Sequence, residues 1–475
     1  MSNSPRLVII GLDGAVPAFI FDQFREDLPN LSRLMKQGCY GKLESCIPAI
    51  TVPAWSCMMS GRDPGELGIY GFRNRIDRSY NFSAIANSNS VKVPRLWDIL
   101  GELGWKVAVL GVPGTYPPQL VNGALVSCFL TPNTDHQYTY PLSLGEQISA
   151  WVGKYLFDVP NFRSTLRVGD PSGQWDEKGR ILRDIYQLCN QSFTLALHLL
   201  ENYHPDLLMF VEMGVDRIHH ALWRHTDETH PLHVPNSPYK NAIHDYYCHV
   251  DRCIGQLLDH CDENTAVLVV SDHGAQPLMG GFCLNQWLIQ NGYLTLKETP
   301  TTPIPLEKAQ VDWSQTKAWG TGGYYGRIFL NVEGREPEGV IPVEEYHQER
   351  EKLIKKLESL TDAWGNDLGV KAYIPQEIYQ RVRGIPPDLI VYFQDLAWRS
   401  QGTVGGDSLY RWENDTGADD ANHARSGIMI FYDPKKPQGG QYLEQAEIYD
   451  ILPTLLDYYG IPMPTGLRGK ILSIW

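Results

Sequence analysis

Short apolar runs rich in Val, Ile and Leu recur along the chain, and stretches with helical periodicity separate most of them. Apolar runs of this length are typical of strands buried on both faces, as in a parallel sheet covered by helices. Strands are predicted at residues 6–13, 40–47, 105–111, 206–213, 266–271, 388–393 and 426–431. Helices are predicted at 17–37, 53–61, 93–104, 181–202, 238–260 and 447–459. The pattern therefore predicts an α/β fold with a mostly parallel central sheet.

Two segments depart from this alternation. Residues 131–180 are rich in Asn, Pro, Tyr, Gly and Asp and have weak periodicity, so we predict a cap insertion there. Residues 296–385 are predicted to form a smaller inserted subdomain, with a strand at 327–331 and a charged helix near 343–360. Because large α/β enzymes often build one sheet with insertions, we expect residues 1–475 to form a single domain.

Composition narrows the choice of partner and compartment. A formal net charge of −14 argues against a surface for nucleic acid or anionic membrane. The chain enters its first predicted strand without a leader, and no apolar stretch approaches the roughly 18–20 residues that span a bilayer. The nine cysteines fit no zinc-ribbon spacing, and although His249 and Cys253 could share a helical face, we interpret the cysteines as reduced structural thiols. We expect a cytoplasmic protein with no membrane span.

Three carboxylates come directly after predicted strands. Asp13 closes the first apolar run, Asp216 follows the run at 207–211, and Asp272 closes the run at 266–271. In parallel sheets the ligand site lies outside the carboxyl ends of the strands. We therefore expect all three carboxylates at one edge of the sheet.

Histidines accompany these carboxylates. His220 is four residues after Asp216, so one helical turn would aim both side chains at the same point. His273 follows Asp272 directly, and His423 precedes the strand predicted at 426–431. Carboxylate oxygens mixed with imidazole nitrogens suit Zn²⁺, or Mn²⁺ as the alternative, better than Ca²⁺. The set predicts a centre for two divalent metal ions, which serves phosphoryl transfer and needs no basic protein surface.

Thr51 is the predicted nucleophile. It precedes Val52-Pro53, which suits the first turn of a helix ending at Gly61, so it would lie where free backbone N–H groups favour an anion. Coordination to a metal is one way to activate a hydroxyl. Each signal has a structural alternative: Thr51 could be a helix cap, Asp13-Gly14 a turn, and His219 could take the place of His220.

Several longer motifs contain these residues. They are Ile10-Gly11-Leu12-Asp13-Gly14, Thr51-Val52-Pro53-Ala54-Trp55, Ser271-Asp272-His273-Gly274 and Asp450-Ile451-Leu452-Pro453. In these motifs the chain resembles the alkaline phosphatase superfamily, in its type I phosphodiesterase/nucleotide pyrophosphatase branch. It is most similar to the subgroup called predicted phosphohydrolases or phosphomutases. The resemblance covers nearly the whole chain and implies a three-layer α/β/α sandwich with a substrate-selecting cap or subdomain.

The resemblance also implies a division of the ligands. Asp216, His220 and His423 would hold one metal, while Asp13, Asp272, His273 and the Thr51 hydroxyl would surround the other. The implied reaction is in-line attack by Thr51 to give a phospho-threonine, which is then hydrolysed. Nucleotide pyrophosphatases usually carry an Asn where this chain has Phe72. Asn74 could replace that Asn, and Arg73 or Arg75 could pair with a more highly charged phosphate.

These observations favour a phosphodiesterase or pyrophosphatase that acts on a small phosphorylated substrate. A phosphomonoesterase or phosphomutase on the same scaffold is the alternative, and phosphonate hydrolysis is also compatible with the fold. A degenerate enzyme that serves only as a binding module is disfavoured, because the full set of predicted ligands is present. The glycine-rich segment 320–326 is interpreted as a loop that could approach the substrate.

Overall fold

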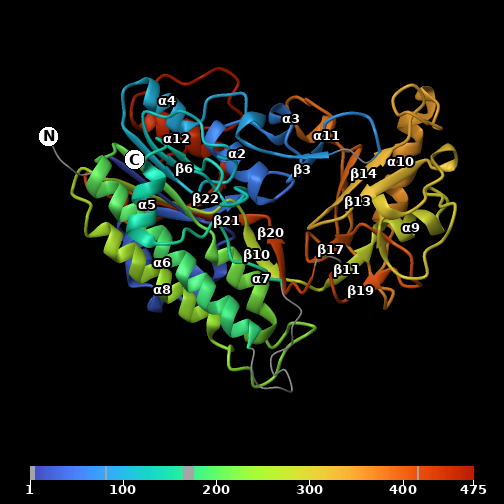
Figure 1. Ribbon diagram of the computed structural model, residues 1–475, viewed down its shortest axis with the longest axis horizontal. Coiled ribbons are helices and arrows are strands. Elements are labelled where there is room, and N and C mark those ends of the chain that lie inside the picture. The colour runs from blue at the N-terminus through green and yellow to red at the C-terminus, as the bar shows by residue number, and fades with distance from the viewer. Residues whose placement is uncertain (1–5, 81–82, 164–175, 415–416, 475) are drawn as a thin grey trace.

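A computed structural model describes residues 6–80, 83–163, 176–414 and 417–474. Nine strands form the central sheet, in the order β22-β2-β21-β9-β1-β8-β5-β6-β7 (Figure 1). Strands β7 and β21 run antiparallel to their neighbours, and the remaining neighbouring pairs are parallel. Their bounds are β1 Leu7–Leu12, β2 Cys39–Glu44, β5 Val107–Leu110, β6 Gly123–Val126, β7 Thr139–Tyr140, β8 Leu207–Glu212, β9 Ala266–Val270, β21 Ser426–Tyr432 and β22 Gln441–Glu447. The predicted mostly parallel sheet is confirmed.

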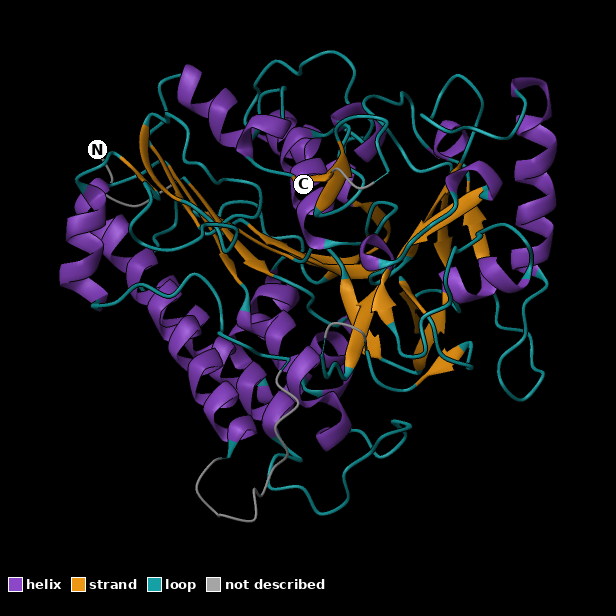
Figure 2. Ribbon diagram, turned by 45° about the vertical axis from the view of Figure 1, so that its right-hand side comes forward, coloured by secondary structure: helices purple, strands orange, loops and turns teal. Residues whose placement is uncertain are grey.

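Helices cover both faces of this sheet. Figure 2 shows a group of long helices on one face and a second group on the other, so the fold is the expected α/β/α sandwich. Strands β1, β8 and β9 are buried along their whole length, which explains their continuous apolar character. The helices of the two layers are α1 Pro29–Gln37, α2 Thr51–Ser60, α4 Leu96–Glu102, α5 Leu144–Val152, α6 Glu177–Tyr203, α7 Gly214–Thr226, α8 Ala242–Leu258 and α12 Ile451–Tyr458. Within the described residues, no helix has the length and apolar character needed to cross a membrane.

The helix predicted at 17–37 is not continuous. A π-helical turn at Phe19–Gln23 and a 3-10 turn at Arg25–Asp27 come first, and α1 begins only at Pro29. Leu28 has φ −114° and ψ 68°, outside the helical region, because the ring of a following proline disfavours helical geometry. The apolar periodicity persists across the break, so the pattern alone did not reveal it.

Residues between Phe282 and Val404 build a second hydrophobic core beside the central sheet. A four-stranded sheet in the order β13-β14-β16-β15 and a three-stranded sheet in the order β17-β11-β19 surround it (Figure 1). The elements are β11 Gly280–Cys283, α9 Leu284–Gln290, β13 Ala318–Thr321, β14 Gly326–Leu330, α10 Tyr346–Glu358, β15 Lys371–Tyr373, β16 Leu389–Tyr392, β17 Trp398–Gln401 and β19 Tyr410–Arg411. The prediction that 388–393 joins the central sheet is wrong, because β16 pairs with β14 and β15. A buried apolar run identifies a strand but not its sheet.

The segment 131–180, predicted as a cap insertion, contains β7, α5 and the start of α6. Its residues 164–175 lie outside the described part of the chain. Strand β6, which precedes this segment, was not predicted. It extends the central sheet from β5 and pairs with β7.

Helix α1 receives its N-terminal cap from a different helix, which gives a test of how the helical layer is held. Asp251 on α8 accepts hydrogen bonds from the backbone N–H groups of Asn30 and Leu31, at 3.1 and 2.8 Å. We predict that Asp251→Ala lowers the free energy of unfolding by about 2 kcal/mol, because these N–H groups would lose their acceptor. Asp259→Ala, at the exposed end of α8, should change it by less than about 0.5 kcal/mol. Equal effects of the two substitutions in a urea titration would contradict the capping role.

Candidate active site

The direction of the strands brings the predicted site residues to one edge of the sheet. Asp13 follows β1, Asp272 and His273 follow β9, and Asp216 and His220 lie on α7, which follows β8. Thr51 is the first residue of α2, two residues earlier than the predicted helix start. His423 lies on β20 Ala421–Ala424, which pairs with β10 Gly274–Pro277 beside the end of β9.

Four of these residues form one group. The Thr51 hydroxyl oxygen lies 3.4 Å from His273 Nε2. The same nitrogen is 3.3 Å from Asp272 Oδ2 and 3.6 Å from Asp13 Oδ1. All four residues are buried. The hydroxyl therefore shares one small space with two carboxylates and an imidazole.

The other three residues form a second group beside the first. Asp216 Oδ1 lies 3.2 Å from His220 Nε2 and 3.7 Å from His423 Nε2. The rings of His273 and His423 stack with centroids 3.7 Å apart, which joins the two groups. Potential ligand atoms of Asp216, His220 and His423 lie within 4.8 Å of one another, as do those of Asp13, Asp216 and His273. The structure thus brings all seven predicted residues together.

Neighbouring groups fix the orientation of these side chains. Trp55 Nε1 donates to Asp13 Oδ2 at 2.8 Å, and Asp419 Oδ1 lies 2.6 Å from His220 Nδ1. The Nδ1 atoms of His273 and His423 face the carbonyl oxygens of Gly274 and Ala49 at 2.8 and 3.0 Å, which leaves both Nε2 atoms directed at the site. The predictions missed Trp55 and Asp419. Trp55 comes four residues after Thr51, and Asp419 comes four residues before His423. This spacing is the sequence feature that could have identified them.

Two glycines let the backbone approach closely here. A Cβ atom on Gly11 would lie 2.5 Å from the Trp55 ring, so only glycine lets that ring pack on β1 below Asp13. Gly14 has φ +69°, which favours glycine, and a Cβ atom there would lie 3.3 Å from Asp216 Oδ1. The sequence Gly11-Leu12-Asp13-Gly14 therefore sets the distance between two of the carboxylates.

Two of the three carboxylates, those of Asp13 and Asp272, disfavour ionisation. Burial raises the pKa of Asp13 and of Asp272 well above the usual range, and nearby carboxylates raise both further. Burial also opposes ionisation of Asp216, but His220 and Arg217 beside it hold its pKa well below the usual range. Burial lowers the pKa of His273 to about 4, so its ring is neutral at neutral pH, as a metal ligand must be.

Four buried polar atoms of the site have no hydrogen-bond partner among the described residues. They are Asp13 Oδ1, Asp216 Oδ1, Asp272 Oδ2 and His220 Nε2. Buried polar atoms are nearly always satisfied. Here Asp216 Oδ1 faces His220 Nε2, Asp272 Oδ2 faces His273 Nε2, and Asp13 shares a candidate ligand group with Asp216 and His273. Divalent cations would satisfy all four and offset the mutual repulsion of the carboxylates, so the residues fit metal ions.

The sequence matches the family model described as type I phosphodiesterase/nucleotide pyrophosphatase over residues 7–419. The chain belongs to this family. It is a metal-dependent hydrolase, and the family match confirms the resemblance to the type I phosphodiesterase/nucleotide pyrophosphatase branch seen in the motifs. The crystal structure of phosphonoacetate hydrolase from Sinorhizobium meliloti 1021 in complex with phosphonoformate is similar, with a TM-score of 0.60, 15% identity and 94% of each chain covered. At that identity the likeness concerns the fold. No curated protein sequence matches the chain.

Basic and aromatic side chains complete this family member's site. Arg217 forms an ion pair with Asp216. It also donates two hydrogen bonds to the carboxylate of Asp158, at 2.7 and 2.8 Å. Arg163 Nε lies 3.0 Å from Asp419 Oδ2. Tyr324, from the glycine-rich segment, stacks on His423 with centroids 4.0 Å apart. The glycine-rich segment therefore reaches the site, as expected. The two arginines carried no distinguishing signal in the sequence.

The structure separates His219 from His220. His219 is buried, its Nε2 lies 3.1 Å from the Tyr247 hydroxyl, and burial lowers its pKa to about 3. Neither candidate ligand group contains it. Of the two neighbours, His220 is the one directed at the site.

The three predicted substrate contacts lie on β3 Arg73–Arg75 and have different surroundings. Both ends of the Asn74 amide bond to backbone groups of its own turn, at Tyr70 and Gly71. Arg75 donates to the Arg78 carbonyl at 2.8 Å and lies 3.5 Å from Glu336. Arg73 is exposed. Among the described residues, no hydrogen bond or ion pair joins these three to the seven residues of the site, so their role in binding stays a prediction.

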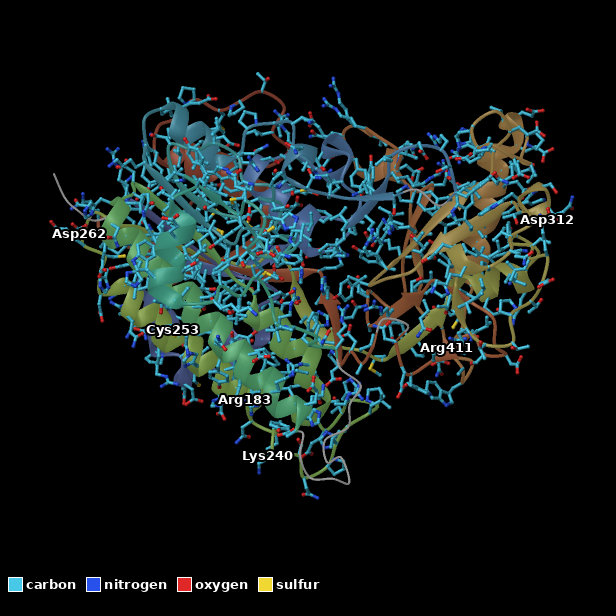
Figure 3. The ribbon with its side chains drawn as sticks, viewed as in Figure 1. Arg183, Lys240, Cys253, Asp262, Asp312 and Arg411 are labelled. Carbon is cyan, nitrogen blue, oxygen red and sulfur yellow. The ribbon has the colours of Figure 1, made fainter. Side chains whose placement is uncertain are left out.

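Cys189, His249 and Cys253 form a separate group on α6 and α8, with potential ligand atoms within 4.8 Å of one another (Figure 3 labels Cys253). His249 Nε2 already lies 2.8 Å from Asn190 Oδ1. Cysteines 189 and 253 form no disulfide. We keep the interpretation of these cysteines as reduced structural thiols.

Trp55 offers a test of how the site is held in place. We predict that Trp55→Phe lowers hydrolase activity by roughly 10–100-fold, because Asp13 loses the N–H that orients it. Trp97→Phe is a matched control, since Trp97 is also buried and its indole nitrogen has no partner among the described residues. Activity and melting temperature should be measured for both variants. Similar activity losses in the two would show that the Trp55 hydrogen bond has no special role.

Proposed function

We propose that the chain is a two-metal phosphodiesterase or pyrophosphatase that acts on a small organic phosphate, with Thr51 as the nucleophile. The observation that carries the proposal is the set of buried carboxylate and imidazole atoms that lack partners and converge beside the Thr51 hydroxyl. Asp216, His220 and His423 would hold one metal, and Asp13, Asp272 and His273 with Thr51 the other. The mixed oxygen and nitrogen donors suit Zn²⁺ first and Mn²⁺ second.

When bound, such a metal pair neutralises phosphoryl oxygens and activates the nucleophile. The chain supplies the rest. Thr51 begins the ten-residue helix α2, whose first N–H groups have no intrahelical partner and favour the phosphoryl oxygens. From this position the Thr51 oxygen attacks phosphorus in line, the bond to the leaving oxygen breaks, and a phospho-threonine forms that water then hydrolyses.

A phosphomonoesterase or phosphomutase is the second candidate. Arg217 bonds to Asp216, and Arg163 bonds to the Asp419 that orients His220, so two cationic groups lie near the site. They could balance the additional charge of a monoester. Phosphonate hydrolysis, the reaction named for the structural neighbour, would call on the same residues.

The nucleophile and the substrate class can be tested together. Bis(4-nitrophenyl) phosphate and 4-nitrophenyl phosphate share a leaving group, so kcat/KM compares diester with monoester directly. With Zn²⁺ or Mn²⁺ restored to metal-free protein, we predict faster turnover of the diester. Thr51→Ala should lower it by roughly 10³-fold or more, while Thr51→Ser should stay within about tenfold because serine keeps the hydroxyl.

A clear preference for the monoester would overturn the diesterase proposal in favour of the second candidate. Undiminished turnover by Thr51→Ala would remove Thr51 from its proposed role. Failure to hydrolyse either ester with both metals bound would contradict action on simple phosphate esters.

Metal content tests the ligand assignment without any substrate. We predict that His423→Ala lowers the metal-to-protein ratio from about two to about one, because only one of the two metal sites would lose a ligand. His219→Gln should keep about two, since His219 bonds to Tyr247 rather than facing the site. The ratio can be measured by elemental analysis of dialysed protein. The assignment fails if the His219 variant loses a metal and the His423 variant does not.

A further inference from the structure

A cavity of about 700 Å³ lies next to the candidate active site, and we call it the arginine cavity. Its arginines are Arg73, Arg75, Arg327 and Arg399, from β3, β14 and β17. Gly323 lines it, and the next residue, Tyr324, stacks on His423. One cavity arginine, Arg399, lies 3.0 Å from the Asp419 that also contacts His220. The wall of the cavity therefore continues into the site.

The cavity carries a local excess of positive charge in a chain of net charge −14. Arg75 and Arg399 are paired with Glu336 and Asp419. Arg73 and Arg327 form no ion pair with a carboxylate in the described part of the chain, and Arg327 donates to the Arg73 carbonyl. Glu307 also lines the cavity, but the guanidinium groups of Arg73 and Arg327 leave an excess of positive charge that is available to an anion.

Two hydroxyl groups of the cavity lack partners as well. Thr321 and Thr403 line the cavity, and the Oγ1 atom of each is buried with no hydrogen-bond partner among the described residues. A buried hydroxyl without a partner is unfavourable, and an oxyanion would accept a hydrogen bond from each. Hydroxyl donors and guanidinium groups together are suited to a carboxylate or a phosphoryl group.

The remaining wall of the cavity includes Leu306, Trp319 and Phe329. Trp319 and Phe329 stack on one another with centroids 5.4 Å apart. The guanidinium carbon of Arg75 lies over both rings, 5.2 and 5.1 Å from their centroids. Apolar side chains beside charged groups are typical of sites that hold an organic molecule with one fixed polar end. The volume suits a small organic molecule rather than an isolated ion.

We propose that the arginine cavity binds a second anionic group, a carboxylate or a phosphoryl group, on the organic part of the substrate. Arg73 and Arg327 bind this group, Thr321 and Thr403 donate hydrogen bonds to it, and the apolar wall packs against the carbon skeleton. The natural substrate is then a phosphate ester with two separated anions. This inference rests on the proposed function, since the first anion is the phosphoryl group at Thr51.

Three methyl aryl phosphates test the proposal, and they differ only in the nitrophenol leaving group. The first has a plain nitrophenol, the second a nitrophenol with a carboxylate, and the third a nitrophenol with a phosphonomethyl group. We expect wild-type protein to show a kcat/KM at least about tenfold higher for one or both charged esters. Arg327→Gln should remove this preference and leave the plain ester within about twofold, while Arg327→Lys should restore part of it. Arg183→Gln, on the exposed side of α6, is the matched control and should keep the preference (Figure 3).

Direct binding separates this inference from the proposed function. Calorimetric titration of metal-free protein with the two charged nitrophenols should show binding that Arg73→Gln weakens at least about tenfold and Arg183→Gln does not. Turnover of the plain ester that requires Thr51, with no preference for charge and no binding of the phenols, would overturn the second-anion site alone. Binding of the phenols without turnover of any ester would instead contradict the proposed function and support the cavity.

Discussion

Three carboxylates buried side by side are the constraint on which the site depends. Asp13, Asp216 and Asp272 are fully enclosed, and the pKa values of Asp13 and Asp272 rise because both are buried and each lies close to another acid. Such an arrangement is unfavourable unless cations compensate it. The topology nevertheless imposes it, because β1, β8 and β9 are adjacent and parallel and end at the same edge. The imidazoles, Trp55 and Asp419 are arranged around that concentration of negative charge.

The second hydrophobic core supplies a wall that the central sheet lacks. Tyr324 from this part of the chain stacks on His423, and Arg399 contacts the carboxylate that orients His220. Side chains from this part of the chain therefore approach the site without interrupting the strands that carry the carboxylates. Such an arrangement is common where loops are held by a rigid scaffold.

Much of this arrangement could be predicted from the sequence, because the relevant signals are local. Apolar runs followed by Asp13, Asp216 and Asp272 identify strands and their ends, and parallel pairing then brings the acids together. The break before Pro29 was missed because the apolar periodicity continues across it. The sheet that β16 joins depends on strand partners far away in the sequence.

The residues that orient the site side chains were harder to predict than the seven site residues themselves. Trp55 and Asp419 act through contacts that span many residues, and Arg217 joins its neighbour Asp216 to the distant Asp158. Tryptophan, aspartate and arginine are also common in other roles. The two neighbouring histidines of α7 differ only in the direction that the helix gives them. The sequence likewise does not show which of Arg73 and Arg75 is paired. In the structure Arg75 lies beside Glu336, and Arg73 is exposed.

The most direct test of the two-metal centre is anomalous X-ray diffraction from crystals grown with Zn²⁺ or Mn²⁺, recorded on both sides of the absorption edge of the metal. We expect two strong peaks about 3.5–4 Å apart, one beside Asp216, His220 and His423 and the other beside Asp13, Asp272, His273 and Thr51. A single peak at this edge of the sheet, or peaks confined to Cys189, His249 and Cys253, would contradict the two-metal centre.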